Sequence, residues 1–165
     1  MKTEQTFEQI VLEHAAMLRR IVCSHEADEA LAEELLQEIH FAIWRALPSF
    51  RGASSIRTFV ARVAINRALT HVGRAVRSPP TTELDTQLSS GEGSPEFQAI
   101  AVDRRSRLVA AVRDLPLAYR DVATLTLEGL TPKEISQTLG VSVNAVAIRL
   151  SRAKQLLRQS VGEHT

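Results

Sequence analysis

Apolar residues along the first fifty positions recur every three or four residues, which is the spacing of one face of an α-helix. The spacing predicts a first helix near Thr6–Cys23 and a second over about Asp28–Leu47, which stops at Pro48. The apolar row of the second helix comprises Leu31, Leu35, Leu36, Ile39, Ile43 and Leu47. We interpret Trp44, in the same helix, as a core residue.

A third helix is predicted after the turn PSFRGASS. Ser54 or Ser55 can cap its first turn, and the helical spacing continues to about Arg77. Its apolar residues form two overlapping rows, so the helix is expected to pack on more than one side. The rows are Ile56, Phe59, Val60 and Val63, then Ile65, Ala68, Leu69, Val72 and Val76.

Residues 78–95, SPPTTELDTQLSSGEGSP, interrupt the helical pattern. Their prolines, glycines, serines and threonines leave too little apolar surface to stabilise a packed structure. We therefore predict a flexible acidic linker over residues 78–96. It separates an N-terminal helical domain, residues 1–77, from a C-terminal one, residues 97–165.

Two more helices are predicted at about Phe97–Arg113 and Leu117–Leu127. The 44% of hydrophobic residues is enough for a packed core, and the low aromatic content of 4% with seven glycines favours an all-α fold over an all-β one. Cys23 has no second cysteine with which to form an internal disulfide, which suits a reducing cytoplasm. We interpret it as a small apolar residue of a helix.

The segment TPKEISQTLGVSVNAVAIRLSRAKQLLR predicts a helix-turn-helix. Thr131 and Glu134 form a capping box, and Pro132 occupies the first helical position, where its missing N–H costs nothing. Gly140 permits the turn, and Ser142 can cap the last helix. The residues expected to face the core are Ile135, Leu139, Val146, Leu150 and Leu157.

Charge is sorted into blocks along a chain whose net charge is only +1. Residues 1–50 carry nine acids against four bases, whereas residues 51–77 carry six arginines and no carboxylate. Residues 78–103 are again acidic, and residues 104–165 hold ten bases. Two basic segments predict two contacts with a polyanion, and the acidic helices predict a different partner.

The sequence argues against an enzyme. Metal-assisted phosphodiester chemistry needs clustered carboxylates among the basic residues, and the arginine-rich helix has none. The five histidines show no metal-binding spacing and no glycine-rich phosphate loop is present, so we expect neither metal nor cofactor. With no signal peptide and no apolar run long enough to span a bilayer, a cytoplasmic protein without membrane insertion is expected.

The two basic helices suit two forms of DNA. The second helix of a helix-turn-helix enters the major groove, where Asn addresses adenine and Arg addresses guanine. The arginine-rich helix also carries Phe59, Asn66 and Thr70, which offer stacking and hydrogen bonds to exposed bases. That combination predicts contact with a separated DNA strand.

Two blocks of the chain resemble the extracytoplasmic-function (ECF) sigma factors. The segment LAEELLQEIHFAIWRALPSFRGASSIRTFVARVAINRALTHVGR resembles their second conserved region. The segment LPLAYRDVATLTLEGLTPKEISQTLGVSVNAVAIRLSRAKQLLR resembles their fourth. The resemblance implies a dissociable subunit that binds core RNA polymerase, recognises the −10 and −35 promoter elements and helps to melt DNA.

The resemblance also implies roles for individual residues. Those expected to bind core polymerase are Glu33, Glu34, Gln37 and Glu38. Those expected to bind the single-stranded −10 element are Arg57, Phe59, Arg62, Asn66, Arg67, Thr70 and Arg74. Those expected to bind the duplex −35 element are Ser142, Asn144, Arg149, Arg152 and Lys154. The linker would run towards the RNA exit path, and an anti-sigma factor is an expected partner.

Some positions depart from the family pattern. Phe59 stands where tryptophan is usual, and His40 where an aromatic residue is usual. Ala145, Ala147 and Ile148 replace a threonine and polar residues, which moves the expected −35 contacts towards the arginines that follow. An alternative hypothesis is an operator-binding regulator that dimerises through its N-terminal helices. This alternative assigns no function to the arginine-rich helix.

Overall fold

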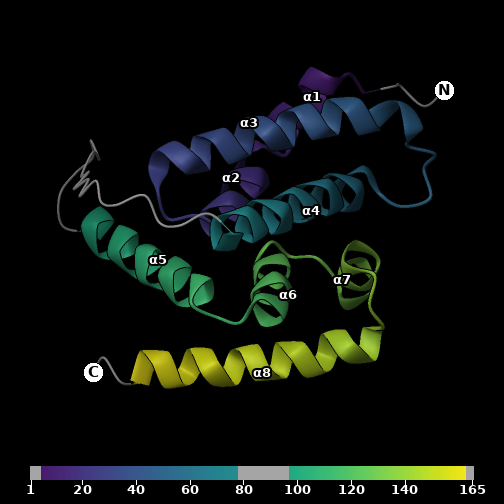
Figure 1. Ribbon diagram of the computed structural model, residues 1–165. Coiled ribbons are helices and arrows are strands. Elements are labelled where there is room, and N and C mark those ends of the chain that lie inside the picture. Colours follow the sequence, from purple (N-terminus) through teal and green to yellow (C-terminus); the bar gives the residue numbers. More distant parts are fainter. Residues whose placement is uncertain (1–4, 78–96, 163–165) are drawn as a thin grey trace.

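The computed structural model describes residues 5–77 and 97–162, with side chains for residues 5–75 and 104–162. Every regular element in these ranges is helical (Figure 1). The elements are α1 (Phe7–Glu13), α2 (Ala15–Cys23), α3 (Glu29–Ala46), a 3-10 turn η1 (Leu47–Ser49), α4 (Ile56–Arg77), α5 (Phe97–Arg113), α6 (Leu117–Leu127), α7 (Pro132–Leu139) and α8 (Val143–Gly162). The all-α prediction is confirmed. The predicted linker, 78–96, lies outside the described residues, and the division into two domains at that segment stays a prediction.

The first helix differs from its prediction because it is divided at His14. The backbone of His14 leaves helical geometry, with φ −104° and ψ 10°, while its ring Nδ1 lies 2.8 Å from the carbonyl oxygen of Ile10. A side chain that bonds the carbonyl four residues back competes with the helical ladder. His14 ends α1 and begins α2, and backbone hydrogen bonds still join the two pieces, since the His14 N–H donates to the Ile10 carbonyl and the Leu18 N–H to the His14 carbonyl. Helix α1 contacts both α2 and α3.

Helices α2, α3 and α4 pack into the N-terminal core, with α4 between its neighbours. The buried side chains of α4 are Thr58, Val60, Ala61, Ala64, Ile65 and Ala68. They cover more than one face of the helix, as its two apolar rows predict. Small alanines allow close helix approach, so the inner faces of three helices meet in one cluster.

The helix-turn-helix forms as predicted. The Thr131 hydroxyl accepts a hydrogen bond from the Glu134 N–H, and the Glu134 carboxylate accepts one from the Thr131 N–H. Gly140 ends α7 at φ +68°, a left-handed conformation that glycine adopts without steric cost. The Ser142 hydroxyl then caps α8 by accepting from the Ala145 N–H at 3.0 Å. Leu157 packs on a second cluster around Val112, Leu115, Ala123 and Ala153, rather than on the cluster that contains Val146.

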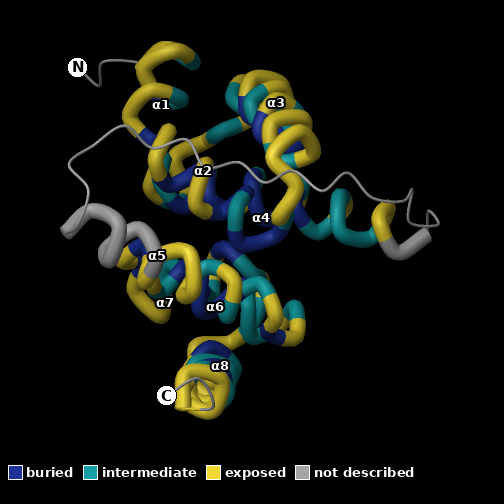
Figure 2. Tube along the Cα trace, turned by 90° about the vertical axis from the view of Figure 1, so that its left-hand side faces the viewer, coloured by how far each residue is buried: buried dark blue, intermediate teal, exposed yellow. Residues whose placement is uncertain are grey.

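The two halves of the chain pack against each other, which the sequence did not predict. Helix α7 contacts α4, and α6 contacts α2. One hydrophobic cluster therefore holds Val60 and Ile65 of α4 together with Leu125, Ile135 and Val146 of the C-terminal half. In Figure 2 buried segments run through the middle of the molecule, whereas α8, seen end-on at the bottom, is exposed on its outer side. We call the contact between the two halves the seam.

Trp44 corrects one prediction. Its side chain is not in the core but 58% exposed, and its ring stacks on the ring of Phe41, with the ring centroids 6.0 Å apart. Phe41 is equally exposed, at 57%. The helical spacing of the buried residues, Leu35, Ile39 and Ile43, leaves Trp44 just outside the inward face.

Candidate nucleic-acid interface

The exposed face of α4 presents Arg62, Asn66 and Thr70, three of the predicted −10 residues. They recur every four residues, so they lie along one line of the helix. The Thr70 hydroxyl donates to the backbone carbonyl of Asn66 at 3.1 Å, which leaves the Asn66 amide group for another partner. Among the described residues, no side chain pairs with Arg62.

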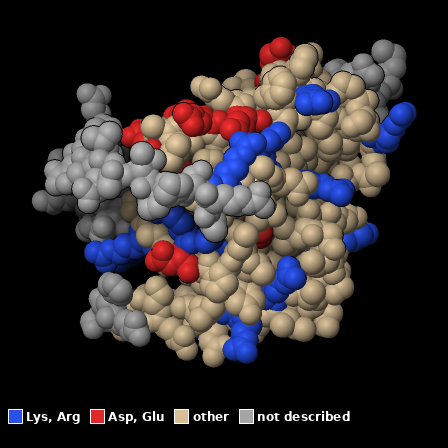
Figure 3. Space-filling view, viewed as in Figure 1, with Lys and Arg blue, Asp and Glu red and all other residues tan. Residues whose placement is uncertain are grey.

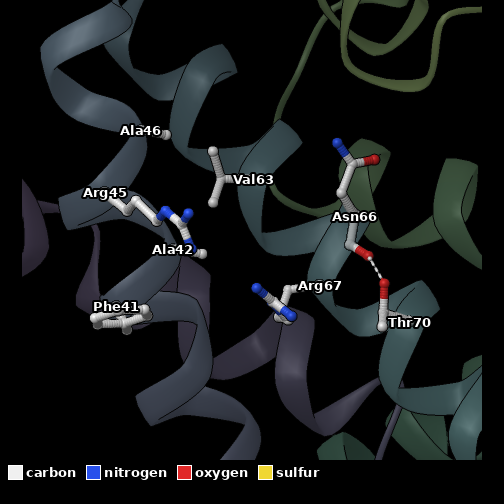
Figure 4. Close-up of a pocket in the computed structure, with 8 residues that line it drawn as sticks. All are labelled: Phe41, Ala42, Arg45, Ala46, Val63, Asn66, Arg67 and Thr70. Carbon is white, nitrogen blue, oxygen red and sulfur yellow. Dashed lines mark hydrogen bonds between the residues drawn. The ribbon is translucent and has the colours of Figure 1, made fainter.

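A groove runs between α3 and α4 beside that face (Figure 4). Its volume is about 490 Å³. The residues that line it are Phe41, Ala42, Arg45, Ala46, Val63, Asn66, Arg67 and Thr70. Three predicted −10 residues, Asn66, Arg67 and Thr70, are thereby brought together at one opening.

Phe59 lies at the side of the α4 face in a partly buried position. Its ring is 4.8 Å from the ring of Phe50, measured between centroids, at an angle of 44°. Phe50 precedes α4 in the loop after η1, so the aromatic contact ties that loop to the helix. In this structure the ring therefore already has an aromatic neighbour.

Two predicted −10 arginines contact other parts of the protein. Arg57 donates to the backbone carbonyl of Glu128 across the seam. Arg74 Nη1 lies 3.6 Å from Glu38 Oε1, so a predicted −10 residue and a predicted polymerase-binding residue form an ion pair. Each contact engages one nitrogen of the guanidinium, so the remaining N–H groups can still donate to another partner.

The acidic face of α3 begins with Asp28, which caps the helix by accepting from the Leu31 N–H at 2.9 Å. Glu34 and Gln37 are exposed and Glu38 is half-buried. Glu33 pairs with Arg19 at 3.3 Å, but both side chains are more than half exposed, so the pair stabilises the fold little. Figure 3 shows acidic side chains along the upper edge of the molecule, over α3, with basic side chains below them.

His40 lies beside this acidic face. Its partial burial lowers the pKa of the imidazole below the ordinary value, and the nearby positive charge of Arg19 lowers it further. Glu33 acts in the opposite direction but more weakly. His40 therefore adds less positive charge to the acidic face than an exposed imidazole would.

The outer face of α8 carries the predicted −35 residues. Asn144, Arg152 and Lys154 are exposed, whereas Arg149 is half-buried. Ser142 is exposed but its hydroxyl already caps the helix. Arg152 Nη1 reaches only Gln155, at 3.5 Å, a weak contact that leaves its charge free for a phosphate or a base.

The seam contains polar contacts that the sequence reasoning missed. Arg20 donates through Nε and Nη2 to both carboxylate oxygens of Glu128, at 2.5 and 2.7 Å, and this pairing raises the pKa of Arg20. His25 Nε2 lies 2.8 Å from Asp121 Oδ1, and both residues are buried. Arg113 donates two hydrogen bonds to the Cys23 carbonyl. The partners are 90 or more positions apart, so no local pattern could reveal them.

No described group of three or more His, Cys, Asp or Glu side chains is arranged to hold a metal ion. Within residues 5–77 and 97–162, no helix is long and apolar enough to cross a bilayer. The side chains of α4 and α8 that reach the surface offer guanidinium, amide, hydroxyl and aromatic groups. Such groups bind nucleic acid by charge, stacking and hydrogen bonds.

Comparison with known protein families decides the identity. The model for sigma-70 region 2 matches residues 10–78, and that for sigma-70 region 4 matches residues 105–157. The chain belongs to the sigma-70 family. The matched regions contain α4 and α8, so each of the two basic helices lies in a different conserved region of a sigma factor.

This sigma factor is similar to sigma factors that include members of the ECF type. It is 26% identical to the RNA polymerase sigma-H factor of Pseudomonas aeruginosa over 96% of the chain and 87% of the relative. It is 29% identical to the ECF sigma-E factor of Escherichia coli over 78% of the chain and 72% of the relative. The resemblance to ECF sigma factors is thus confirmed, and an operator-binding regulator is not favoured.

Two solved structures share the fold. One is CnrH in complex with the cytosolic domain of CnrY, with a TM-score of 0.73, 22% identity and coverage of 99% of this chain and 92% of that one. The other is the sigma factor RpoE of Bartonella quintana in complex with the anti-sigma factor NepR, with a TM-score of 0.73, 20% identity and coverage of 94% and 96%.

Proposed function

We propose that this ECF sigma factor carries core RNA polymerase to promoters, where α8 reads the −35 element and α4 holds the separated −10 strand. The observation that carries the proposal is the pair of matched regions, each with a basic helix whose free face suits a different form of DNA. As a sigma factor it works in the cytoplasm with the bacterial polymerase and has no catalytic activity of its own.

Core polymerase binds the exposed acidic face of α3 in this proposal. Glu34 and Gln37 are not needed to cap α3, because Asp28 supplies the helix cap. Their exposed side chains can therefore contact a partner. Glu33 and Glu38 extend the same face, and each has an arginine partner that a basic polymerase surface can replace. Fixed negative charge beside exposed polar groups favours association with a basic helix and accelerates it.

The −10 strand lies along α4. Arg62, Asn66 and Thr70 supply charge, an amide and a hydroxyl along one line, and Arg67 faces the adjoining groove. Taking bases out of the duplex stack costs a few kcal/mol, and contacts to exposed bases and phosphates offset this cost. Phe59 stacks on a base in this proposal, with Phe50 as its neighbour inside the protein.

The −35 duplex lies on α8. Asn144 is near the start of the helix, where groove-reading residues of a helix-turn-helix lie, and Arg149, Arg152 and Lys154 follow. Each base contact with paired hydrogen bonds discriminates by about 1–3 kcal/mol. Ser142 retains its capping bond while its backbone approaches a phosphate.

Promoter binding requires the seam to open. The two elements are centred about 25 base pairs apart, or about 85 Å at 3.4 Å per base pair. A compact chain of this length has a radius of gyration of about 15 Å. The packed molecule therefore cannot reach both elements, and opening the seam separates Arg57 from the Glu128 carbonyl. We propose that polymerase and DNA favour the opened form, and that an anti-sigma factor favours a form unable to bind them.

Run-off transcription with core polymerase on genomic fragments of the host tests the function and finds a promoter. Permanganate footprinting on that promoter then reports whether the DNA opens. We expect a transcript and reactive thymines near the start site only when the protein is added. Stable binding of the free protein to duplex DNA as a dimer, with no polymerase complex, would instead support the operator-binding regulator.

A further inference from the structure

The outer face of α8 carries a large apolar side chain that is not part of the core. Ile148 is 58% exposed, and neither hydrophobic cluster of the described residues includes it, whereas Val146 and Ala153 of the same helix are buried. Single exposed apolar residues are common on protein surfaces. The significance of Ile148 therefore depends on the residues around it.

The neighbours of Ile148 along the helix are two of the predicted −35 residues. Asn144, Ile148 and Arg152 recur every four residues, so they form one line on the surface of α8, and all three are exposed. Four helical residues rise by about 6 Å, which is less than two base-pair steps of about 3.4 Å. When Asn144 and Arg152 both reach base edges, Ile148 lies over the bases between them.

The adjoining line of the helix adds to this apolar surface. Val143 and Ala147 are exposed there, beside Ile148. Isoleucine has the longest side chain of the three and extends farthest from the helix axis. Ile148 is therefore the apolar residue of α8 that is best placed to touch a base.

Base edges in the major groove offer an apolar side chain only one partner. Adenine, guanine and cytosine present acceptors and amino groups there, whereas thymine also presents a methyl group at C5. An isoleucine against a polar edge displaces water without replacing its hydrogen bonds, which is unfavourable. Against a methyl group it removes apolar surface from water on both partners, which is favourable. An isoleucine in this position therefore favours thymine over the other three bases.

We propose that Ile148 selects a thymine in the −35 element by packing on its 5-methyl group, between a base contacted by Asn144 and one contacted by Arg152. Ile148 is then a specificity-determining residue, although it can make no hydrogen bond to a base through its side chain. The same contact accepts 5-methylcytosine better than cytosine, because only the former carries the methyl group. The proposal rests on the proposed function, since α8 meets the major groove only if it reads the −35 element.

The test measures binding of holoenzyme to promoter duplexes that differ by single methyl groups. The promoter comes from run-off transcription, and each thymine of its −35 element, on either strand, is replaced in turn by deoxyuridine, which keeps the base pairing and the O4 acceptor. Two further duplexes carry cytosine or 5-methylcytosine at the position where the wild type responds. Wild type is compared with Ile148→Ala and Ile148→Val. Val161→Ala is the matched control, because Val161 is a 63% exposed apolar residue near the other end of α8.

We expect removal of one thymine methyl to weaken wild-type binding about 4-fold, the equivalent of one buried methylene-sized group. Ile148→Ala should bind the thymine and deoxyuridine duplexes equally, so the two losses are not additive. Ile148→Val should keep part of the discrimination and Val161→Ala all of it. Wild type should also prefer 5-methylcytosine to cytosine by about 4-fold, and Ile148→Ala should show no such preference.

Core binding and thermal unfolding are measured for each variant, and both should stay as in wild type. Equal wild-type affinity for every thymine and deoxyuridine duplex would overturn the proposal, as would discrimination that survives Ile148→Ala. Loss of core binding in Ile148→Ala would also overturn it and would make Ile148 a contact with protein. Wild-type holoenzyme whose promoter binding is unchanged by a scrambled −35 element would instead refute the proposed function.

Discussion

Helices α4 and α8 are both long, basic and free of carboxylates, yet they occupy opposite places in the fold. Helix α4 is an inner helix, packed against α2, α3 and α7, with six described side chains buried. Helix α8 buries only Val146 and Ala153 and turns most of its surface outward. A basic helix can thus serve as the centre of a core or as a free reading surface.

The difference follows from the rows of apolar residues. The two overlapping apolar rows of α4 are buried, so only a narrow strip of its surface remains for DNA. The arginines on that strip lie close to core residues and to the seam. A single row, as in α8, leaves a wide face on which basic residues are independent of the core. Substitutions on α4 are therefore expected to combine stability and DNA effects, and those on α8 to separate them.

The largest expected effect is on the stability of the inner helix. Ile65→Ala should lower the free energy of unfolding by about 2–5 kcal/mol, since Ile65 is 1% exposed and its loss leaves a cavity. Val143→Ala, at a position on α8 that is 50% exposed, should change it by about 0.5 kcal/mol or less. Urea denaturation compares the two. Equal losses would mean that burial does not determine the stability cost at these two positions.

The seam provides the next test, because it ties α4 to the helix-turn-helix. Glu128→Ala removes the acceptor of both Arg20 hydrogen bonds, and should destabilise the packed form by about 1.5–3 kcal/mol, the range for bonds to charged groups. The exposed Arg19–Glu33 pair offers the control, with about 0.2–1 kcal/mol expected for Glu33→Ala. Small-angle scattering should show a larger radius of gyration only for Glu128→Ala. An unchanged radius would mean that the apolar part of the seam suffices.

The two DNA faces should be separable by the form of DNA. Asn66→Ala should weaken capture of the −10 single strand and promoter opening by about 1–3 kcal/mol while −35 duplex binding stays unchanged. Arg152→Ala should do the reverse and should lower the salt slope on duplex DNA by about 0.9. Gel-shift titrations of holoenzyme on each DNA, with core binding measured separately, distinguish them. Loss of core binding in either variant would assign that residue to another surface.

The smallest expected effect is the pH dependence that His40 contributes to the N-terminal half. Its pKa is lowered in the folded state from the ordinary 6.5, chiefly by burial, so the unfolded chain binds the proton more readily. This contribution to stability is complete above pH 6.5 and declines as the pH falls towards the folded pKa. Thermal unfolding of His40→Gln should show a shallower decline between neutral and mildly acidic pH than wild type. Parallel curves would exclude a role for His40.

The sequence by itself determined most of the helices, because the signals that start and stop them are local, although the break at His14 was not predicted. The capping box at Thr131, the left-handed Gly140 and the cap at Ser142 each involve residues within three or four positions, and all are in the structure. The family and the polarity of the exposed helix faces could also be predicted from the sequence, since both depend on residue type and order. The residues of the candidate interfaces were assigned in this way and await the tests above.

Only the tertiary structure decided which polar groups meet. His25 with Asp121 and Arg20 with Glu128 join helices about 100 positions apart, and the groove brings Phe41 and Arg45 opposite Arg67 because α3 packs on α4. Trp44 was misplaced for a related reason: one turn of helix separates an inward position from an outward one, and neighbouring helices determine where the boundary falls. Local propensity acts over a few residues, whereas burial of polar and apolar groups depends on the whole packed chain.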